Sequence, residues 1–270
     1  MTEPALVYEK RDGIAYLTIN RPERRNAFSP EVICRLADAW QDYAADDSLR
    51  VAIITGAGDK SFSAGADLGR LTPLMSGARQ PEDEWDHRLL KNPNLGQIAT
   101  LRGIPMYKPI IAAINGFCLA GGCELIQATD IRLAAEHATF ALTEVKWSLL
   151  PFAGSMVRLP RQIPYSKAME IMLVGDTFDA QEAYRIGLIN SVVPAAQLLA
   201  KAEEFAQKIA ANGPIAVRKI KETVLRALSV SLEEGFQIEN ASAREVLATE
   251  DAKEGPRAFV EKRKPRYTGR

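Results

Sequence analysis

The chain has 270 residues, of which 47% are hydrophobic, so it is long enough for one large domain with its own core. Its 34 basic and 34 acidic residues cancel, and no overall field favours nucleic acid or an anionic membrane surface. No apolar run reaches the roughly 18 residues that a membrane-spanning helix needs. Three cysteines in no secreted pattern and an N-terminus without a signal sequence predict a reduced, cytoplasmic protein.

The N-terminal segment is expected to form paired strands. Residues 5–20 alternate apolar and polar side chains on both sides of Arg11-Asp12-Gly13, the pattern of a hairpin whose turn needs a positive φ at glycine. A helix is predicted from Ser29, an N-cap residue followed by a proline at the first helical position. Its buried face is expected to hold Val32, Ile33, Leu36, Trp40 and Tyr43.

Two short apolar runs, residues 51–58 and 109–116, end in glycine and are typical of strands covered on both faces. A third strand is predicted over residues 130–136. Strands that alternate with helices indicate an α/β core. Residues 70–93 are rich in charge and turn formers, and we expect a mobile flap or a loose helix pair there. Its apolar members are Leu71, Leu74, Met75, Trp85 and Leu90.

Beyond about residue 165 the sequence has mainly helical patterns. They cover residues 166–175, 179–190, 195–213 and 216–230, and Asp179 with Glu182 three positions later is a capping signal. The helical C-terminal part has more apolar surface than a small core needs, which favours self-association. We therefore expect two parts, a core over residues 1–200 and a helical oligomerisation region over residues 201–270.

Several familiar motifs fail on their spacing. The stretch TGAGDKS at residues 55–61 has Asp59 where a phosphate-binding loop needs glycine before the lysine, and the third glycine of a dinucleotide fingerprint is absent. Cys118 and Cys123 have no further cysteine or histidine near them in sequence, so buried structural thiols are a better interpretation than metal ligands. No nucleophile-elbow pattern is present.

Two glycine-containing stretches point to chemistry. FSAGADL, residues 62–68, and LAGGCE, residues 119–124, leave main-chain N–H groups open to a ligand, the second at a predicted helix start. Two such donors that converge on one oxygen would form an oxyanion hole. Glu124 lies in the first helical turn and Glu144 follows the next strand, so the two acids can flank a polarised carbonyl as general acid and base. The alternative is that Glu124 only complements the helix dipole and Glu144 is a solvated loop residue.

Five stretches in order resemble the enoyl-CoA hydratase family, also called the crotonase superfamily, from about residue 5 to 266. They are NRPERRNAFS, SFSAGADL, INGFCLAGGCELIQATDIRLA, FALTEVKWSLLPFAGSMVRLPR and EGPRAFVEKRKPRY. The resemblance implies a spiral of ββα units with a perpendicular β-layer and C-terminal helices that build trimers, often paired into hexamers. It implies no cofactor beyond the coenzyme A of the substrate and no metal. Neither nucleic acid nor a membrane is expected as a partner, because the net charge is zero and no apolar run is long enough to cross a bilayer.

The resemblance also assigns roles to residues. The thioester oxygen of an acyl-CoA would bind the N–H groups of Ala66 and Gly121. Glu124 would orient and deprotonate one water, and Glu144 would deliver the proton to the α-carbon. Because many isomerases, decarboxylases and hydrolases of the superfamily keep only one of these acids or neither, the pair favours an enoyl-CoA hydratase.

Coenzyme A would lie along the first loop and the GAD turn. Its phosphates are assigned to Arg24, although an exposed arginine after a strand is an equally good interpretation. The remaining CoA and substrate contacts are expected from Ala64, Asp67, Leu68, Phe117 and Phe152. The sequence departs from the family after Glu144, where Phe152 to Ser155 replace a glycine-rich stretch. The ring of Phe152 would shrink the pocket or shift the reaction towards isomerisation, decarboxylation or C–C cleavage. A binding protein without turnover is a further alternative.

Overall fold

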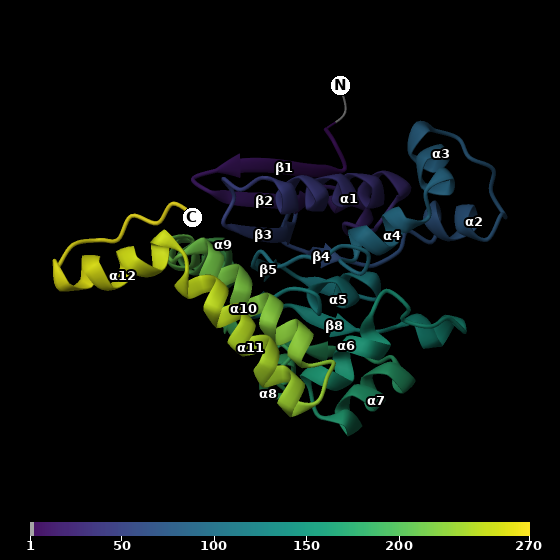
Figure 1. Ribbon diagram of the computed structural model, residues 1–270. Helices are drawn as coiled ribbons and strands as arrows, with labels where there is room; N and C mark the ends of the chain where they lie inside the picture. The colour runs from purple at the N-terminus through teal and green to yellow at the C-terminus, as the bar shows by residue number, and fades with distance from the viewer. Residues whose placement is uncertain (1–2) are drawn as a thin grey trace.

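The computed structural model describes residues 3–270, which form two β-sheets with helices around them (Figure 1). The larger sheet has six strands in the order β1-β2-β3-β5-β7-β10. Its strands are β1 (Leu6–Arg11), β2 (Ile14–Ile19), β3 (Val51–Gly56), β5 (Ile110–Ile114), β7 (Ile131–Ala135) and β10 (Ser191–Val193). The smaller sheet consists of β4 (Ser61–Ser63), β6 (Phe117–Leu119), β8 (Thr139–Ala141) and β9 (Phe178–Asp179).

The two sheets are linked by a repeated unit. Three times in succession the chain passes from the large sheet to the small one, in β3–β4, β5–β6 and β7–β8, and then enters helical segments. The strands β3, β5 and β7 are parallel, and so are β4, β6 and β8. This repeat confirms the predicted α/β class with ββα units. It also brings the segments that follow β4, β6 and β8 to the same edge of the small sheet.

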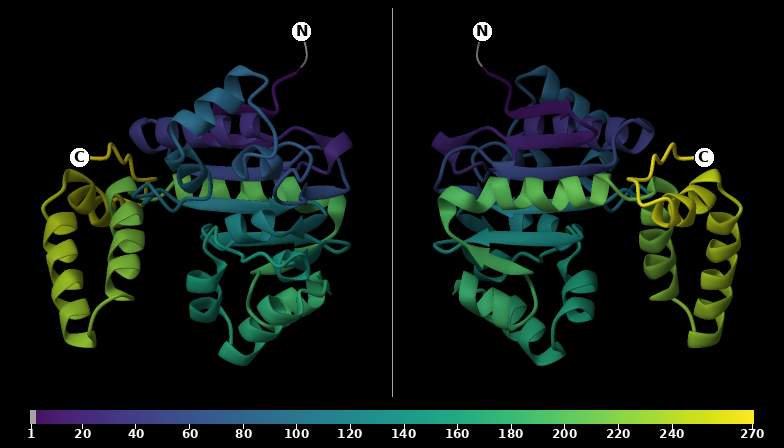
Figure 2. Two further views of the ribbon diagram at one scale, coloured as in Figure 1. Left: turned by 90° about the vertical axis from the view of Figure 1, so that its right-hand side faces the viewer. Right: turned by 90° about the vertical axis from the view of Figure 1, so that its left-hand side faces the viewer.

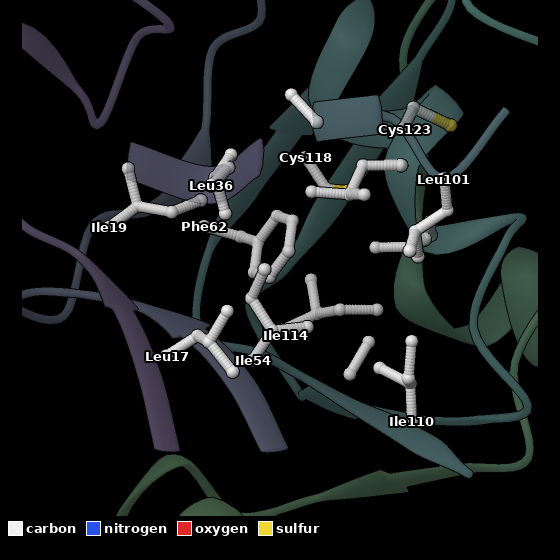
Figure 3. Close-up of a cluster of buried hydrophobic side chains, with 14 of the residues drawn as sticks. Leu17, Ile19, Leu36, Ile54, Phe62, Leu101, Ile110, Ile114, Cys118 and Cys123 are labelled. Carbon is white, nitrogen blue, oxygen red and sulfur yellow. The ribbon is translucent and has the colours of Figure 1, made fainter. Parts of the chain in front are cut away.

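Both faces of the large sheet are covered. Helix α1 (Pro30–Ala45) packs on one face, where its fully buried Trp40 and Leu36 join a cluster with Leu17 and Ile54. Helix α9 (Leu198–Ala210) lies across the other face against Tyr16, Ile53, Ile111 and Leu133. Figure 3 shows Phe62 of β4 among side chains of the large sheet, with Cys118 close by. This double burial explains why β3 and β5 are continuous apolar runs.

The N-terminal predictions are confirmed. Strands β1 and β2 form an antiparallel hairpin, and both Asp12 and Gly13 of its turn have positive φ, 52° and 74°. The Ser29 hydroxyl accepts a hydrogen bond from the N–H of Val32 at 3.3 Å, as its N-cap assignment requires. All three cysteines are buried and free of disulfides, and burial raises the pKa of Cys34 to about 11.

The segment over residues 70–93 contains two short helices, α2 (Leu71–Met75) and α3 (Glu84–Lys91), followed by α4 (Asn94–Ala99). This arrangement agrees with the helix-pair alternative. The buried carboxylate of Asp86 in α3 accepts a hydrogen bond of 2.6 Å from Arg79 of the connection between the helices, and Arg79 also donates to the carbonyl of Arg70 just before α2. Leu74 is buried, and Leu71 and Trp85 pack against the core, whereas Met75 and Leu90 are exposed.

The C-terminal part is helical, as predicted. It comprises α6 (Ser155–Gln162), α7 (Tyr165–Val174), α8 (Ala180–Arg185), α10 (Pro214–Ala227), α11 (Leu232–Leu247) and α12 (Glu250–Val260), together with α9. The helix predicted over residues 179–190 is too long. It ends at Arg185 because Gly187 adopts a left-handed φ of 79°, and the chain then continues to β10. Figure 2 shows α10 and α11 side by side, extending away from the two sheets.

Within residues 3–270 no helix combines the length and the apolar character that crossing a bilayer would require.

Candidate active site

Glu124 lies in the first turn of α5 (Gly121–Ile126), directly after β6 of the small sheet. Its side chain is buried, with 3% of the residue exposed, and its Oε1 accepts a hydrogen bond of 3.1 Å from the N–H of Ser155. Burial raises the pKa of Glu124. The N–H and the side chain of Ser155, the N–H of Ala153 and the charge of Arg158 oppose that rise. The carboxyl group is therefore held by main-chain donors and is not a solvated helix-start acid.

Glu144 opens the 3₁₀-helix η2 (Glu144–Trp147), which follows β8. Its Oε2 atom is buried and has no hydrogen-bond partner among residues 3–270. Burial, and to a smaller extent the nearby carboxyl group of Glu124, raise the pKa of Glu144 to about 7. Since β6 and β8 are neighbours in the small sheet, the segments after them bring the two acids together. At neutral pH this pair can hold one ionised and one protonated carboxyl group.

The N–H groups of Ala66 and Gly121 are the expected oxyanion-hole donors, and neither donates a hydrogen bond to another group of residues 3–270. Ala66 forms a parallel bridge with Phe28, but the bridge uses the Gly65 carbonyl and the Asp67 N–H instead. Gly121 is the first residue of α5, where an N–H has no partner within the helix. Both groups remain available to a ligand oxygen.

Close approach of two loops places these donors near one another. Gly65 has a φ of 84°, and a Cβ atom built on it would lie 2.7 Å from the Cβ of Ala120 and 2.9 Å from the nitrogen of Gly121. Ala120 itself has a φ of 48°, which a residue with a side chain rarely adopts. Two hydrogen bonds hold it there, since its N–H donates to Ala141 and its carbonyl accepts from Glu124, both at 2.9 Å. The glycine at position 65 is thus required by packing.

The residues expected at coenzyme A lie around the first loop and the GAD turn. Arg24 is exposed on the 3₁₀-helix η1 (Pro22–Arg24), Ala64 is half-buried, and Leu68 is 56% exposed. Phe117 is 38% exposed, and the guanidinium of Arg25 lies 5.4 Å from the centre of its ring.

Asp67 has a structural function that the sequence did not suggest. Its carboxylate forms an ion pair of 2.9 Å with Arg21 and also accepts hydrogen bonds from the N–H groups of Gly69 and Arg70. It therefore joins the first loop to the GAD turn.

The segment that departs from the family pattern, residues 152–155, lies beside Glu124. The N–H groups of Ala153 and Ser155 interact with the Glu124 carboxylate. The side chain of Phe152 is not buried, since 71% of the residue is exposed. The Phe152 carbonyl accepts a hydrogen bond from Arg102. Whether the ring narrows the acyl pocket stays a prediction.

Three polar residues near Glu124 were not predicted from the sequence: Ser155 and Gln127, which are buried, and Arg158, which is half-buried. Ser155 and Gln127 are hydrogen-bonded to each other at 2.9 Å, and Arg158 donates to the carbonyls of Thr100 and Leu101. The only available signal was that Gln127 follows Glu124 by three positions in a helix, which places both on one side of it.

No cluster of three or more histidine, cysteine, aspartate or glutamate side chains suited to a metal occurs in the described part of the chain. Two surface cavities, of about 240 and 440 Å³, lie elsewhere: one near Arg50 and Lys108, the other near Tyr16 and Glu203. Neither is lined by Glu124 or Glu144, so the candidate site rests on the carboxyl pair and the free N–H groups.

Comparison with known proteins agrees with this geometry. The family model for enoyl-CoA hydratase/isomerase matches residues 9–270. Enoyl-CoA hydratase EchA19 of Mycobacterium tuberculosis is 41% identical over 99% of this chain and 97% of its own length. Crotonyl-CoA hydratase of Syntrophomonas wolfei is 36% identical, with 97% of each chain covered.

The fold is similar to solved structures as well. The crystal structure of an enoyl-CoA hydratase from Bacillus anthracis is 37% identical, with a TM-score of 0.89 over 98% of this chain and all of the other. The sequence match over nearly the whole length, the repeated ββα units and the paired acids lead to one conclusion. This chain belongs to the enoyl-CoA hydratase/isomerase family.

Proposed function

We propose that this protein adds water across the 2,3-double bond of an acyl-CoA thioester. The observation that carries the proposal is a pair of acids, the buried Glu124 and the half-buried Glu144 with its buried Oε2 atom, beside two main-chain N–H groups that lack a partner within the described chain. Relatives named enoyl-CoA hydratase and crotonyl-CoA hydratase at 41% and 36% identity support it. No cofactor other than the coenzyme A of the substrate is part of the proposal.

The two N–H groups, on Ala66 and Gly121, would bind the thioester oxygen and stabilise the enolate that forms as hydroxide adds to the β-carbon. Removal of one oxyanion-hole donor typically raises the barrier by about 3 kcal/mol. Because both donors are preorganised by the Gly65–Ala120 contact, they need no rearrangement when negative charge develops on the oxygen.

Glu124 would act as the base and Glu144 as the acid. The Glu124 carboxylate takes a proton from water, the water oxygen bonds to the β-carbon, and the π electrons move to the thioester oxygen. Glu144 then gives its proton to the α-carbon on the same face. A proton transferred from Glu124 to the neighbouring Glu144 restores the starting state, so the net change is one added water.

The raised pKa of Glu144, about 7, supports its assignment as the acid, because it keeps a proton where an ordinary glutamate would have lost it. The main-chain N–H groups around Glu124 support its assignment as the base, since they favour the ionised form.

The test is the loss of ultraviolet absorbance of the enoyl thioester, with crotonyl-CoA and with longer and branched analogues. Mass spectrometry should show a product heavier by one water. An isomerase, decarboxylase or C–C hydrolase gives a different product mass, and a binding protein gives none. Glu136→Gln is a matched control because Glu136 is exposed just after β7. Full activity in Glu144→Gln would disprove the assignment of the acid.

We further propose that coenzyme A lies along the first loop and the GAD turn, with Arg24 near its phosphates and Ala64, Asp67, Leu68 and Phe117 along its path. The exposure of Arg24 and Leu68 beside the free Ala66 N–H supports this course.

We also propose a homotrimer or a hexamer, built through the region over residues 201–270, in the cytoplasm. Large exposed apolar side chains along α10 to α12 support self-association: Ile220, Leu228, Leu232, Phe236, Leu247 and Phe259 are 55–85% exposed. The free, buried cysteines are consistent with a reducing compartment.

A further inference from the structure

Two buried polar side chains that the hydration mechanism does not use lie next to Glu124. Ser155 is fully buried and Gln127 is 2% exposed. The Ser155 N–H donates to Oε1 of Glu124 at 3.1 Å, and Nε2 of Gln127 donates to the Ser155 hydroxyl oxygen at 2.9 Å. These contacts connect Gln127, Ser155 and Glu124 in one chain of hydrogen bonds.

The direction of this chain is fixed by the backbone. Nε2 of Gln127 also lies 3.0 Å from the carbonyl oxygen of Cys123. Turning the amide over would place its oxygen against that carbonyl, so the nitrogen must face Cys123 and Ser155. The Ser155 hydroxyl oxygen therefore accepts from Gln127, and its own hydrogen is free for another acceptor. Burial raises the pKa of Glu124, and the side chain of Ser155 opposes part of that rise.

The local backbone suits a donor at this position. Ser155 is the first residue of α6, after Gly154 with a φ of 134°. Its N–H is among the first of the helix, which have no partner within the helix and carry partial positive charge. The main chain thus directs one donor towards the Glu124 carboxylate, and the same residue carries a hydroxyl whose hydrogen is not used by Gln127.

We propose that Ser155 is a positioning residue for Glu124, whose N–H and hydroxyl together hold the carboxylate, and that Gln127 orients the Ser155 hydroxyl. The assignment deepens the proposed hydration, on which it rests for the role of Glu124 as base. The proposal thus assigns a role to Ser155, which is one of the residues that replace the glycine-rich stretch usual after the second glutamate.

The charged groups that face Glu124 are Glu144 on η2 and Arg158 on α6. Replacing Ser155 by alanine leaves both charges and the Ser155 N–H in place and removes only the hydroxyl. The ionised form of Glu124 then loses one donor, so the pKa of this carboxyl group is expected to rise by about one unit.

The direct test is a titration of ¹³C-labelled glutamate carboxyl groups by NMR in the whole protein, with Glu124→Gln identifying the Glu124 signal. In S155A that signal should titrate about one pH unit higher than in the unaltered protein. Ser191→Ala is the control, because the Ser191 hydroxyl is buried without a partner among the described residues. An unchanged Glu124 titration in S155A overturns the inference.

Kinetics provide a second readout that a purely structural role would not change. In S155A the acid limb of the pH profile of kcat should move up by about one unit, with KM little changed. Gln127→Met should shift the acid limb in the same direction by a smaller amount. Combining Gln127→Met with S155A should shift the acid limb no further than S155A alone. A further loss in the double variant, or an acid limb at its original pH in S155A, contradicts the proposal.

The two proposals fail separately. If the unaltered protein hydrates no enoyl-CoA, the proposed function fails, whereas the NMR titration still reports whether Ser155 supports the Glu124 carboxylate.

Discussion

At the residue scale, two glutamates of the same chemistry differ through their surroundings. Glu124 accepts from the Ser155 N–H, and the Ala153 N–H also favours its ionised form. Glu144 has a buried oxygen without a partner among residues 3–270 and a pKa raised to about 7. Such a division of two nearby acids into a base and an acid is a common basis for proton transfer at neutral pH.

Activity should therefore fall both when the pH is raised and when it is lowered. As the pH rises through about 7, the pKa of Glu144, this residue loses the proton that the α-carbon needs, and kcat/KM should fall. At low pH Glu124 becomes protonated and cannot accept a proton from water. Rates with crotonyl-CoA between pH 5 and 9 should give a bell-shaped profile. Glu144→Gln should lower kcat by about 10²- to 10⁴-fold across this range.

Stability should respond to the same group. The pKa of Glu144 is higher in the folded chain, about 7, than its ordinary value of 4.5, so its protonated form favours folding. That contribution is complete below about pH 4.5 and is lost as the pH rises to about 7. Glu144→Gln removes the cost of ionising this buried group. Compared with the unaltered protein, the substitution should increase the free energy of unfolding by about 2 kcal/mol more at pH 8 than at pH 5. Urea unfolding at both pH values measures this difference, and equal effects at the two would contradict it.

At the element scale, the contact between the GAD turn and the start of α5 determines where the two free N–H groups lie. Gly65 meets Ala120 and Gly121, and a Cβ atom on Gly122 would come within 2.7 Å of the Ser63 carbonyl oxygen. The two glycines therefore allow two ββα units to approach more closely than side chains would permit.

Gly65→Ala should separate these elements. The new methyl group meets Ala120 and the main chain at 2.7–2.9 Å, and the φ of 84° is strained for alanine. We expect a loss of about 10²-fold in kcat, comparable to removal of one oxyanion donor. Gly77→Ala is the control, since Gly77 also has a positive φ but no atom within 4 Å of the added Cβ. Similar rates for the two variants would show that close packing at Gly65 is not required.

At the scale of the whole molecule, α10 to α12 bury little of their own apolar surface. No residue of α10 is buried, and Leu232, Phe236 and Leu247 of α11 are 77%, 55% and 73% exposed. Two ion pairs connect α10 to the core, Arg218 with Asp47 and Lys221 with Asp130, at 2.8 and 2.7 Å. The apolar side chains on these helices are thus free to pack against other copies.

Phe236→Glu should weaken the proposed oligomer. A charge placed in an apolar interface loses its hydration without gaining a partner, which costs several kcal/mol. Light scattering after size exclusion should show a smaller species than for the unaltered protein. Leu199→Glu, on an exposed position of α9 outside this region, should leave the mass unchanged. An unaltered protein that elutes as a monomer would refute the proposed oligomer.

The sequence by itself determined the elements that depend on neighbouring residues. The Asp12-Gly13 turn, the Ser29 N-cap and the apolar runs of β3 and β5 are local patterns, and the structure confirms each of them. Glu124 and Glu144 were also predicted from short motifs next to loop glycines, whereas the N–H groups of Ala66 and Gly121 were assigned through the resemblance to the family.

Only the tertiary structure decided the groups that come from distant parts of the chain. Ser155 reaches Glu124 across 31 positions, and Arg21 reaches Asp67 across 46. No spacing rule links such residues, because parallel strands of successive units bring them together. The difference between the two glutamates has the same origin, since burial and neighbouring donors exist only once the chain has folded.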